Sequence, residues 1–310
     1  MERLKTPTIV ESNLLYLFVG ILLLFGGQIV QSREIYSGLL ITEFIIILLP
    51  NLIYLKARGF SLKKVLRLNR ISFEQGVYTV FIMIFAYPVA VFLNVIMVSI
   101  LTRFTTVLPS GVPLPSTLKE FGVGLFIMAL APGICEEVMF RGTMLTSYSK
   151  IGKNKSIIIT AFLFGIFHFN LFNFIGPTFL GIILGILLFK TNSIYTSMVG
   201  HTINNSIALT IGFLVTKFAN HIDEVSTQAI DIEPNAQLLV GMLVLLGIGI
   251  GSLFMLIFLL KKIPIYDSSL DIDEYEEITT EREKVNMFHF IPVVVVVAIF
   301  INLNFKFLLR

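Results

Sequence analysis

Apolar segments separated by short polar stretches run along the whole chain. Most of them approach or exceed the roughly 18 apolar residues that a helix needs to cross the hydrocarbon core of a bilayer. The pattern predicts nine membrane helices, or eight with a C-terminal addition, near residues 14–30, 38–55, 77–101, 121–147, 156–173, 175–189, 194–216, 237–260 and 287–309. We therefore expect an all-α fold, a polytopic membrane helical bundle of eight to nine transmembrane helices.

The composition supports a membrane protein. Of the 310 residues, 55% are hydrophobic and 14% are charged, whereas a soluble domain is about 45–50% apolar and about 25% charged. The net charge is only +3 and no basic tract is interleaved with aromatic residues, so nucleic acid is not an expected partner. The single cysteine, Cys135, rules out an internal disulfide and a multi-cysteine zinc site.

Basic residues in the short loops indicate the orientation of the chain. Lys and Arg cluster at residues 3–5, 56–70, 150–155, 190 and 261–262, and all of these clusters fall on one side if the spans alternate. Such clusters mark the cytoplasmic side. We therefore expect a multi-pass protein of the cell membrane with a cytoplasmic N-terminus. The first apolar segment lacks a small-x-small cleavage site, so it is interpreted as a retained span.

The polar stretches divide the chain into four predicted regions. These are two N-terminal spans with a basic interfacial segment (1–76), a membrane core (77–262), an acidic cytoplasmic linker (263–286) and a C-terminal span (287–310). The segment 59–76 has the spacing of an amphipathic interfacial helix, although a plain basic loop is the alternative. The acidic stretch 267–284 is a solvated linker or a partner-binding tail. Glycines four apart at 181–185 and 247–251 predict close helix packing.

Two glutamates and an arginine form the first polar motif, Glu136-Glu137-x-x-x-Arg141. Ionisable side chains within a span are energetically unfavourable and point to function. Glu137 and Arg141 are four residues apart, so on a helix they face each other and can pair. Glu136 points about 100° away and has no local cation, which leaves it free for chemistry. The alternative is an ion pair that closes the span at the interface.

Pro132 precedes this motif and is expected to kink or break the helix, because proline removes a backbone donor and clashes with the preceding turn. If a new helix starts there, both glutamates lie in its first turns. The helix dipole favours negative charge at that position.

Two further motifs place histidines within predicted spans. His168 lies in the segment 156–173, and His201 lies in the segment 194–216 four residues before Asn205, so the latter two share a helix face. Asn204 is expected on a different face. Each motif alone is typical of polar contacts between helices. At about 1.5 Å per residue, however, all three motifs lie at a similar depth, which predicts one joint site.

A carboxylate, two imidazoles and an amide suit hydrolysis of a peptide bond. Glu136 fits a general base, His168 would orient the water, and His201 and Asn205 would donate hydrogen bonds to the oxyanion. Alternatively, Glu136, His168 and His201 bind a divalent metal such as zinc that activates the water. The sequence does not decide between these, although the His-Glu-x-x-His motif is absent. Cys135 is interpreted as a small hydrophobic residue rather than a nucleophile.

These motifs, in this order on successive membrane helices, resemble the CPBP family. The family comprises type II CAAX prenyl endopeptidases and bacteriocin-processing or immunity proteins, and is also called the ABI family. The resemblance covers roughly residues 75–260, with a motif core at 120–210, and rests on Glu136-Glu137-x-x-x-Arg141, Phe164-x-x-x-His168 and His201-x-x-x-Asn205.

The resemblance implies an intramembrane protease with a CPBP-like core at 77–262. It implies that Glu136 and His168 activate water, that His201 and Asn205 stabilise the oxyanion, and that Glu137 with Arg141 holds the site together. Its substrate would be a membrane-embedded or lipid-associated peptide. The short loops resemble those of bacterial members. The family is commonly labelled a metalloprotease, but a metal-independent glutamate mechanism has also been argued for it.

Two other functions are compatible with a polytopic chain. One is a non-catalytic membrane scaffold or bacteriocin-immunity protein that regulates a membrane-protein partner; degraded motifs would favour it, and all three are intact. The other is a transporter with a proton-relay glutamate, for which inverted repeats are expected. The chain shows no convincing repeat.

Overall fold

A computed structural model describes residues 6–105, 113–226, 234–266 and 285–308, and between 219 and 238 it describes only the backbone. Within these ranges no strand is present, and eight helical segments are long and apolar enough to cross a membrane. The predicted all-α, polytopic membrane bundle is therefore confirmed. The acidic stretch 267–284 lies outside the described residues.

Two N-terminal spans form a helical hairpin. Each combines α-helix with a π-helical segment, in the order α1 (Ile9–Leu22), η1 (Leu23–Gly27), α2 (Gln28–Arg33), α3 (Ile35–Leu40), η2 (Ile41–Leu48) and α4 (Leu49–Ala57). Side-chain caps fix where the spans begin. Thr8 and Glu11 form a capping box at the start of α1, and Glu34 accepts hydrogen bonds from two backbone N–H groups at the start of α3.

Among the described residues, the rest of the bundle contains six further spans and two shorter helices, α5 and α10. In chain order the elements are α5 (Leu62–Val65), α6 (Phe73–Leu101), α7 (Leu118–Gly124), η3 (Leu125–Leu130), α8 (Ala131–Glu137), η4 (Val138–Met144), α9 (Leu145–Tyr148), η5 (Ser149–Ile151), α10 (Lys153–Ile166), η6 (Leu171–Asn173), α11 (Ile175–Thr191), α12 (Ile194–Ser226), α13 (Pro234–Lys262), η8 (Met287–Phe290) and α15 (Ile291–Leu308). The segments from α7 to η5 form one continuous span.

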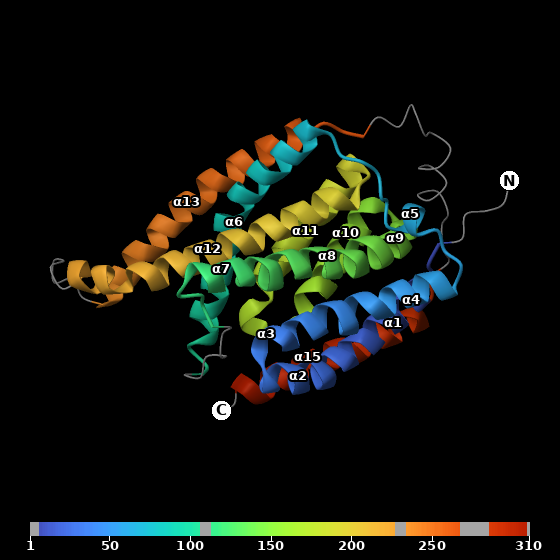
Figure 1. Cartoon of the computed structure of the whole chain (residues 1–310), viewed down its shortest axis with the longest axis horizontal. Helices are drawn as coiled ribbons and strands as arrows, with labels where there is room; N and C mark the ends of the chain where they lie inside the picture. Colours follow the sequence, from blue (N-terminus) through green and yellow to red (C-terminus); the bar gives the residue numbers. More distant parts are fainter. Residues whose placement is uncertain (1–5, 106–112, 227–233, 267–284, 309–310) are drawn as a thin grey trace.

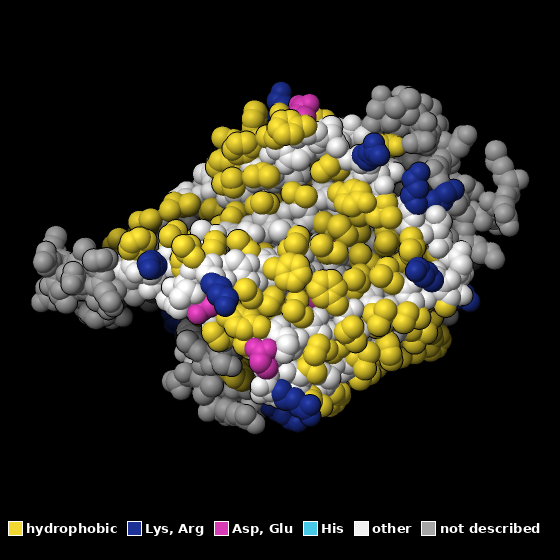
Figure 2. Space-filling view, viewed as in Figure 1, with side chains coloured by type: hydrophobic (Ala, Val, Ile, Leu, Met, Phe, Trp, Pro, Cys, Tyr) yellow, Lys and Arg dark blue, Asp and Glu magenta, His cyan; other side chains and the backbone are white. Residues whose placement is uncertain are grey.

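The helices are arranged around the span that carries the two glutamates (Figure 1). In this view α6 and α13 lie on one side, and the N-terminal hairpin with α15 lies on the other. Helix α12 packs against both α6 and α8, and η2 of the hairpin also packs against α8. The visible surface is largely hydrophobic, and Lys and Arg side chains gather toward its ends (Figure 2). This distribution suits a bundle surrounded by lipid.

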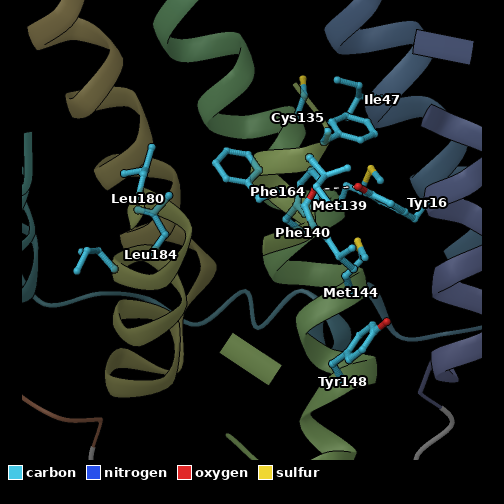
Figure 3. Packing of buried hydrophobic residues seen from close by; sticks show 14 of the residues in the cluster. Tyr16, Ile47, Cys135, Met139, Phe140, Met144, Tyr148, Phe164, Leu180 and Leu184 are labelled. Carbon is cyan, nitrogen blue, oxygen red and sulfur yellow. Dashed lines mark hydrogen bonds between the residues drawn. The ribbon is translucent and has the colours of Figure 1, made fainter. Parts of the chain in front are cut away.

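The buried core is rich in aromatic side chains. Tyr16, Phe140, Phe164 and Phe167 pack together with ring centroids 4.9 to 6.2 Å apart, and several of them are visible in Figure 3. The Tyr16 hydroxyl donates a 2.8 Å hydrogen bond to the carbonyl of Leu163, near the end of α10. The first span therefore supports the helix end that precedes His168.

The expected span at 156–173 is shorter than predicted. Helix α10 has 14 residues, which gives a length of about 21 Å, less than the roughly 30 Å of a hydrocarbon core. It starts after Gly152, which has a φ of 104°, and it ends before Phe169, which has a φ of 50°. The sequence analysis placed His168 within a helix. In the structure it lies in the turn that follows α10.

The structure corrects two local predictions. Residues 59–76 do not form one amphipathic helix: only Leu62–Val65 is helical before α6 begins, because Val65 and Leu66 are buried against the bundle and Arg67 takes a φ of 50°. Of the kink or break expected at Pro132, the break does not occur. Pro132 lies in the first turn of α8, directly after the π-helical turn η3, and such turns are one way in which helices adapt to local irregularity.

The two glycine pairs behave differently. A Cβ at Gly181 would meet the Cα of Ala161 at 2.8 Å, and one at Gly185 would meet Ile157 at 3.2 Å, so the predicted close packing is confirmed between α11 and α10. At Gly247 and Gly251 no described atom outside the local helix lies within 4 Å. The prediction is wrong there.

This difference gives a matched pair of variants. Gly181→Ala should lower the thermal stability of the detergent-solubilised protein, because overpacking typically costs about 1–3 kcal/mol. Gly247→Ala makes the same chemical change in a helix without the clash. Thermal unfolding of both variants would measure the difference, and equal melting temperatures would contradict close packing at Gly181.

Candidate functional site

The two glutamates lie at the end of α8, between the π-helical turns η3 and η4. π-Helical turns are rare and occur frequently at functional sites. Backbone dihedrals remain helical at Glu137 and Val138, so neither glutamate lies at a free helix N-terminus. The expected support from a helix dipole is therefore absent.

Glu137 is the structural glutamate. Its side chain is fully buried, and its Oε1 atom lies 2.8 Å from Arg141 Nη1 and 2.9 Å from His201 Nδ1. The predicted pair with Arg141 is confirmed, and His201 is an additional partner. The guanidinium of Arg141 also lies 4.5 Å from the centroid of the Phe164 ring. A buried carboxylate with these partners fixes the position of His201 on α12 relative to α8.

Glu136 has a different environment. Its Oε2 atom lies 3.8 Å from His201 Nε2, beyond direct hydrogen-bond distance, and no described Lys or Arg forms an ion pair with it. Its side chain is 12% exposed, whereas that of Glu137 is 0% exposed. Glu136 therefore borders open space and keeps a carboxylate oxygen free for a water molecule or substrate.

His168 lies beside Phe164, as its spacing suggests. Its Nδ1 atom is 3.0 Å from the carbonyl oxygen of Phe164. A carbonyl can only accept, so Nδ1 carries the hydrogen, and in the neutral ring Nε2 is left as an acceptor. The Phe164 ring contacts the imidazoles of His168 and His201 edge-on, with centroids 5.3 and 5.7 Å away. Phe164 thus separates the two histidines at a fixed spacing.

The C-terminal span holds the turn that carries His168. Asn304, which is buried in α15, donates hydrogen bonds to the carbonyls of Phe169 and Phe300, at 3.3 and 2.8 Å. Its Oδ1 atom accepts a 2.7 Å hydrogen bond from the N–H of Leu171. One amide side chain therefore bonds to the backbone on both sides of Asn170 and restrains this turn. The sequence analysis did not single out Asn304.

The two asparagines after His201 act together. Asn205 donates a 3.1 Å hydrogen bond to the carbonyl of Met128, and Asn204 donates a 3.1 Å hydrogen bond to Asn205 Oδ1. Asn204 was expected on a separate face, yet both residues line the same cavity. The two side chains have four N–H hydrogens in total, and these contacts use two of them. Two N–H hydrogens remain for a ligand.

Close helix packing positions this motif. A Cβ at Gly133 of α8 would clash with the hydroxyl of Thr202, the residue after His201. Only glycine lets α8 and α12 approach so closely at this level. His201 can therefore reach Glu137.

Two cavities meet at Glu136 and His168, the two residues that line both. The smaller cavity, about 320 Å³, contains His201, Asn204 and Asn205 together with groups from α6 and α11. The larger, about 600 Å³, is formed mainly by the N-terminal hairpin and α15. Both volumes fall in the range of small-ligand sites, about 300–1,000 Å³. The three motifs that were expected at a similar depth therefore come together in space, and Glu136 and His168 border both cavities.

The larger cavity contains a carboxylate that the sequence analysis missed. Glu43 of η2 is only 7% exposed and lines this cavity with Glu136, and among the described atoms its Oε2 has no hydrogen-bond partner. The signal was available, because Glu43 is an ionisable residue inside the apolar segment 38–55. It was missed because it belongs to no spaced polar motif.

The side chains do not form an evident metal centre. Among the residues that the structure describes, no three His, Cys, Asp or Glu side chains are arranged to hold a metal ion. His201 Nδ1 is bonded to Glu137 and His168 Nδ1 to the carbonyl of Phe164, so Nε2 of each ring is uncommitted, and metal-binding histidines commonly have such a partner on the other nitrogen. Cys135 packs in the hydrophobic core. The mechanism below is written for the side chains alone.

The two glutamates should respond differently to removal of charge. Glu137→Gln leaves Arg141 buried without a full counter-charge, and breaking a buried pair typically destabilises by about 3–5 kcal/mol. Glu136→Gln is isosteric and removes a carboxylate that has no ion pair with Arg or Lys. Thermal unfolding in detergent should show a large loss for the first variant and little for the second. A reversed order would contradict the assignment of Glu137 as structural.

The comparisons with known proteins agree with the motifs. The family model for type II CAAX prenyl endopeptidase Rce1-like proteins matches residues 119–207. No match was found among curated proteins or among solved structures. The matched segment contains all three motifs and covers the site from α7 to α12. Residues 119–207 thus carry the signature of the Rce1-like type II CAAX prenyl endopeptidase family, in agreement with the CPBP resemblance.

Proposed function

We propose that the protein is an intramembrane endopeptidase that hydrolyses a peptide bond of a membrane-associated protein or peptide. The observation that carries the proposal is that Glu136 and His168 line both cavities, with His201 beside Glu136. A scissile bond placed there is within reach of a base on one side and of hydrogen-bond donors on the other. The family match supports the same reaction class.

In this mechanism Glu136 takes a proton from a water molecule. Nε2 of His168, the acceptor nitrogen of its neutral ring, accepts a second hydrogen bond from the same water and orients it. The oxygen of the water attacks the scissile carbonyl carbon. Glu136 then gives its proton to the leaving nitrogen as the carbon–nitrogen bond breaks. General acid–base catalysis of this kind contributes about 10²–10⁴-fold to a rate.

The smaller cavity would stabilise the oxyanion. Asn204 and Asn205 have N–H hydrogens left for a ligand, and His201 donates from Nε2 when its ring carries both protons. The carboxylate of Glu137 accepts the hydrogen bond from Nδ1 and orients the ring, with Nε2 3.8 Å from Glu136 Oε2. A single oxyanion donor is worth about 10²–10³-fold in rate. Arg141 holds Glu137 in place.

The basic loops suggest the orientation of the protein. We propose that it resides in the cell membrane with the basic ends of its spans in the cytoplasm, and that the two cavities hold the site within the membrane. The substrate is a membrane-embedded or lipid-associated peptide. Membrane lipids are its other neighbours.

Removal of the base tests the proposed function. In protein reconstituted in liposomes, Glu136→Gln should lower cleavage of a membrane-bound probe peptide by about 10²-fold or more. The probes are a farnesylated peptide with a C-terminal CAAX tetrapeptide and an unprenylated membrane-spanning peptide. Mass spectrometry of the products would measure cleavage. Undiminished cleavage would refute the role of Glu136, and absence of cleavage of both probes by the unaltered protein would favour the scaffold alternative.

A second test concerns the support of His168. Asn304→Leu removes the hydrogen bonds to Phe169 and Leu171, so the turn should loosen and kcat should fall about tenfold, with KM changed less. Asn302→Leu is the matched control, because Asn302 is exposed on the same helix. Asn304→Gln retains the amide and should recover part of the activity. Equal activity of the two leucine variants would contradict the positioning role.

A further inference from the structure

The larger cavity differs chemically from the smaller one. Apart from the shared Glu136, no carboxylate lines the smaller cavity, which holds the predicted oxyanion donors. The larger cavity adds a second carboxylate, Glu43, and among its lining residues there is no Lys or Arg. One chamber therefore suits an oxygen that gains negative charge, and the other suits a group that gains positive charge.

Glu43 is held in this position by packing. Helical segment η2 lies against α8, and Ile47, one turn after Glu43, belongs to the same buried cluster as Cys135, the neighbour of Glu136 (Figure 3). The two glutamate side chains line the same cavity. No cation and no hydrogen-bond donor among the described residues satisfies Glu43 Oε2.

A buried carboxylate without a partner is unfavourable for folding, because its hydration is lost and nothing replaces it. Hydrolysis of a peptide bond supplies the missing partner. When the nitrogen of the tetrahedral intermediate is protonated, it carries a positive charge and two N–H donors. After the carbon–nitrogen bond breaks, the amine becomes an ammonium group by taking the proton of the new carboxylic acid. Such a group in the larger cavity lies within a chamber lined by both Glu43 and Glu136.

We propose that Glu43 is a further catalytic residue, on the leaving-group side of the site, where its carboxylate binds the amine released from the scissile bond. This inference rests on the proposed peptidase function. The carbonyl oxygen of the substrate faces the smaller cavity, and the segment that follows the scissile bond enters the larger one. Glu136 transfers the proton taken from water to the nitrogen, the carbon–nitrogen bond breaks, and Glu43 accepts hydrogen bonds from the new amino group.

The lining of the larger cavity would select the substrate segment that follows the scissile bond. The walls of the larger cavity come mainly from η1, α2, η2 and α15, all outside the segment 119–207 matched by the family model. The lining is apolar at Leu23, Leu39 and Leu303 and carries amides at Gln28 and Gln31. It therefore suits an apolar peptide segment whose backbone can bond to the amides.

The test compares two substrates that share the acyl side. One is a membrane-bound peptide, and the other is the corresponding ester, whose leaving oxygen gains no positive charge. Glu43→Gln should lower the cleavage rate of the peptide about tenfold or more, because hydrogen bonds to charged groups contribute strongly, and should leave the rate with the ester nearly unchanged. Glu136→Gln should slow both substrates, since both need an activated water.

The outcomes separate the two proposals. If Glu136→Gln slows both substrates but Glu43→Gln slows them equally or not at all, the role of Glu43 is refuted and the peptidase function stands. If Glu136→Gln has no effect, the proposed function itself fails. Glu74→Gln is the control for loss of one glutamate, because Glu74 is exposed at the start of α6.

Two further measurements guard against a folding defect. Glu43→Gln removes an unpaired buried charge, so its melting temperature should equal or exceed that of the unaltered protein. Glu43→Asp keeps the charge on a shorter side chain and should show a smaller defect, again confined to the peptide. Inhibition by a product peptide with a free amino terminus should weaken about tenfold in Glu43→Gln, whereas weak inhibition by its N-acetylated form should not change. Equal effects on both peptides would overturn the proposal.

Discussion

The buried carboxylate of Glu137 is the interaction on which the rest of the site depends. It accepts from Arg141 on its own helix and from His201 on α12 through the same oxygen atom. A buried charge requires such partners, so the two helices are held in one register. Because Arg141 and His201 both bond to Glu137, neither forms a hydrogen bond with the neighbouring Glu136, whose carboxylate stays free. The free carboxylate of Glu136 thus follows from the buried contacts of Glu137.

The two cavities on either side of Glu136 and His168 differ in chemical character. Donor groups of α12 lie in the smaller chamber, and the unpartnered carboxylate of Glu43 lies in the larger one. Glu136 and His168 lie between them. An amide bond changes charge in opposite senses at its oxygen and its nitrogen during hydrolysis, so an asymmetric pair of chambers suits the proposed reaction. Preorganised groups of this kind are effective because they need no rearrangement during the reaction.

Elements outside the family-matched segment complete the site. Tyr16 of the first span bonds to the end of α10, and Asn304 of the last span restrains the turn that carries His168. The short helix α10 makes these contacts necessary, since His168 lies beyond its end and lacks the support of a helical backbone. The N-terminal hairpin and α15 therefore help to position His168 and also form much of the wall of the larger cavity.

Hydrophobic pattern and motif spacing were enough to predict the helical bundle, the Glu137–Arg141 pair and a site that joins Glu136, His168 and His201, because helix periodicity and apolar length are local properties. They did not show that His168 lies in a turn, that Pro132 leaves its helix intact, or that Asn204 joins Asn205. These depend on how neighbouring helices pack. Glu43 and Asn304 lie far from the motifs in sequence, and only the tertiary structure brings them to the site, because their partners belong to other helices.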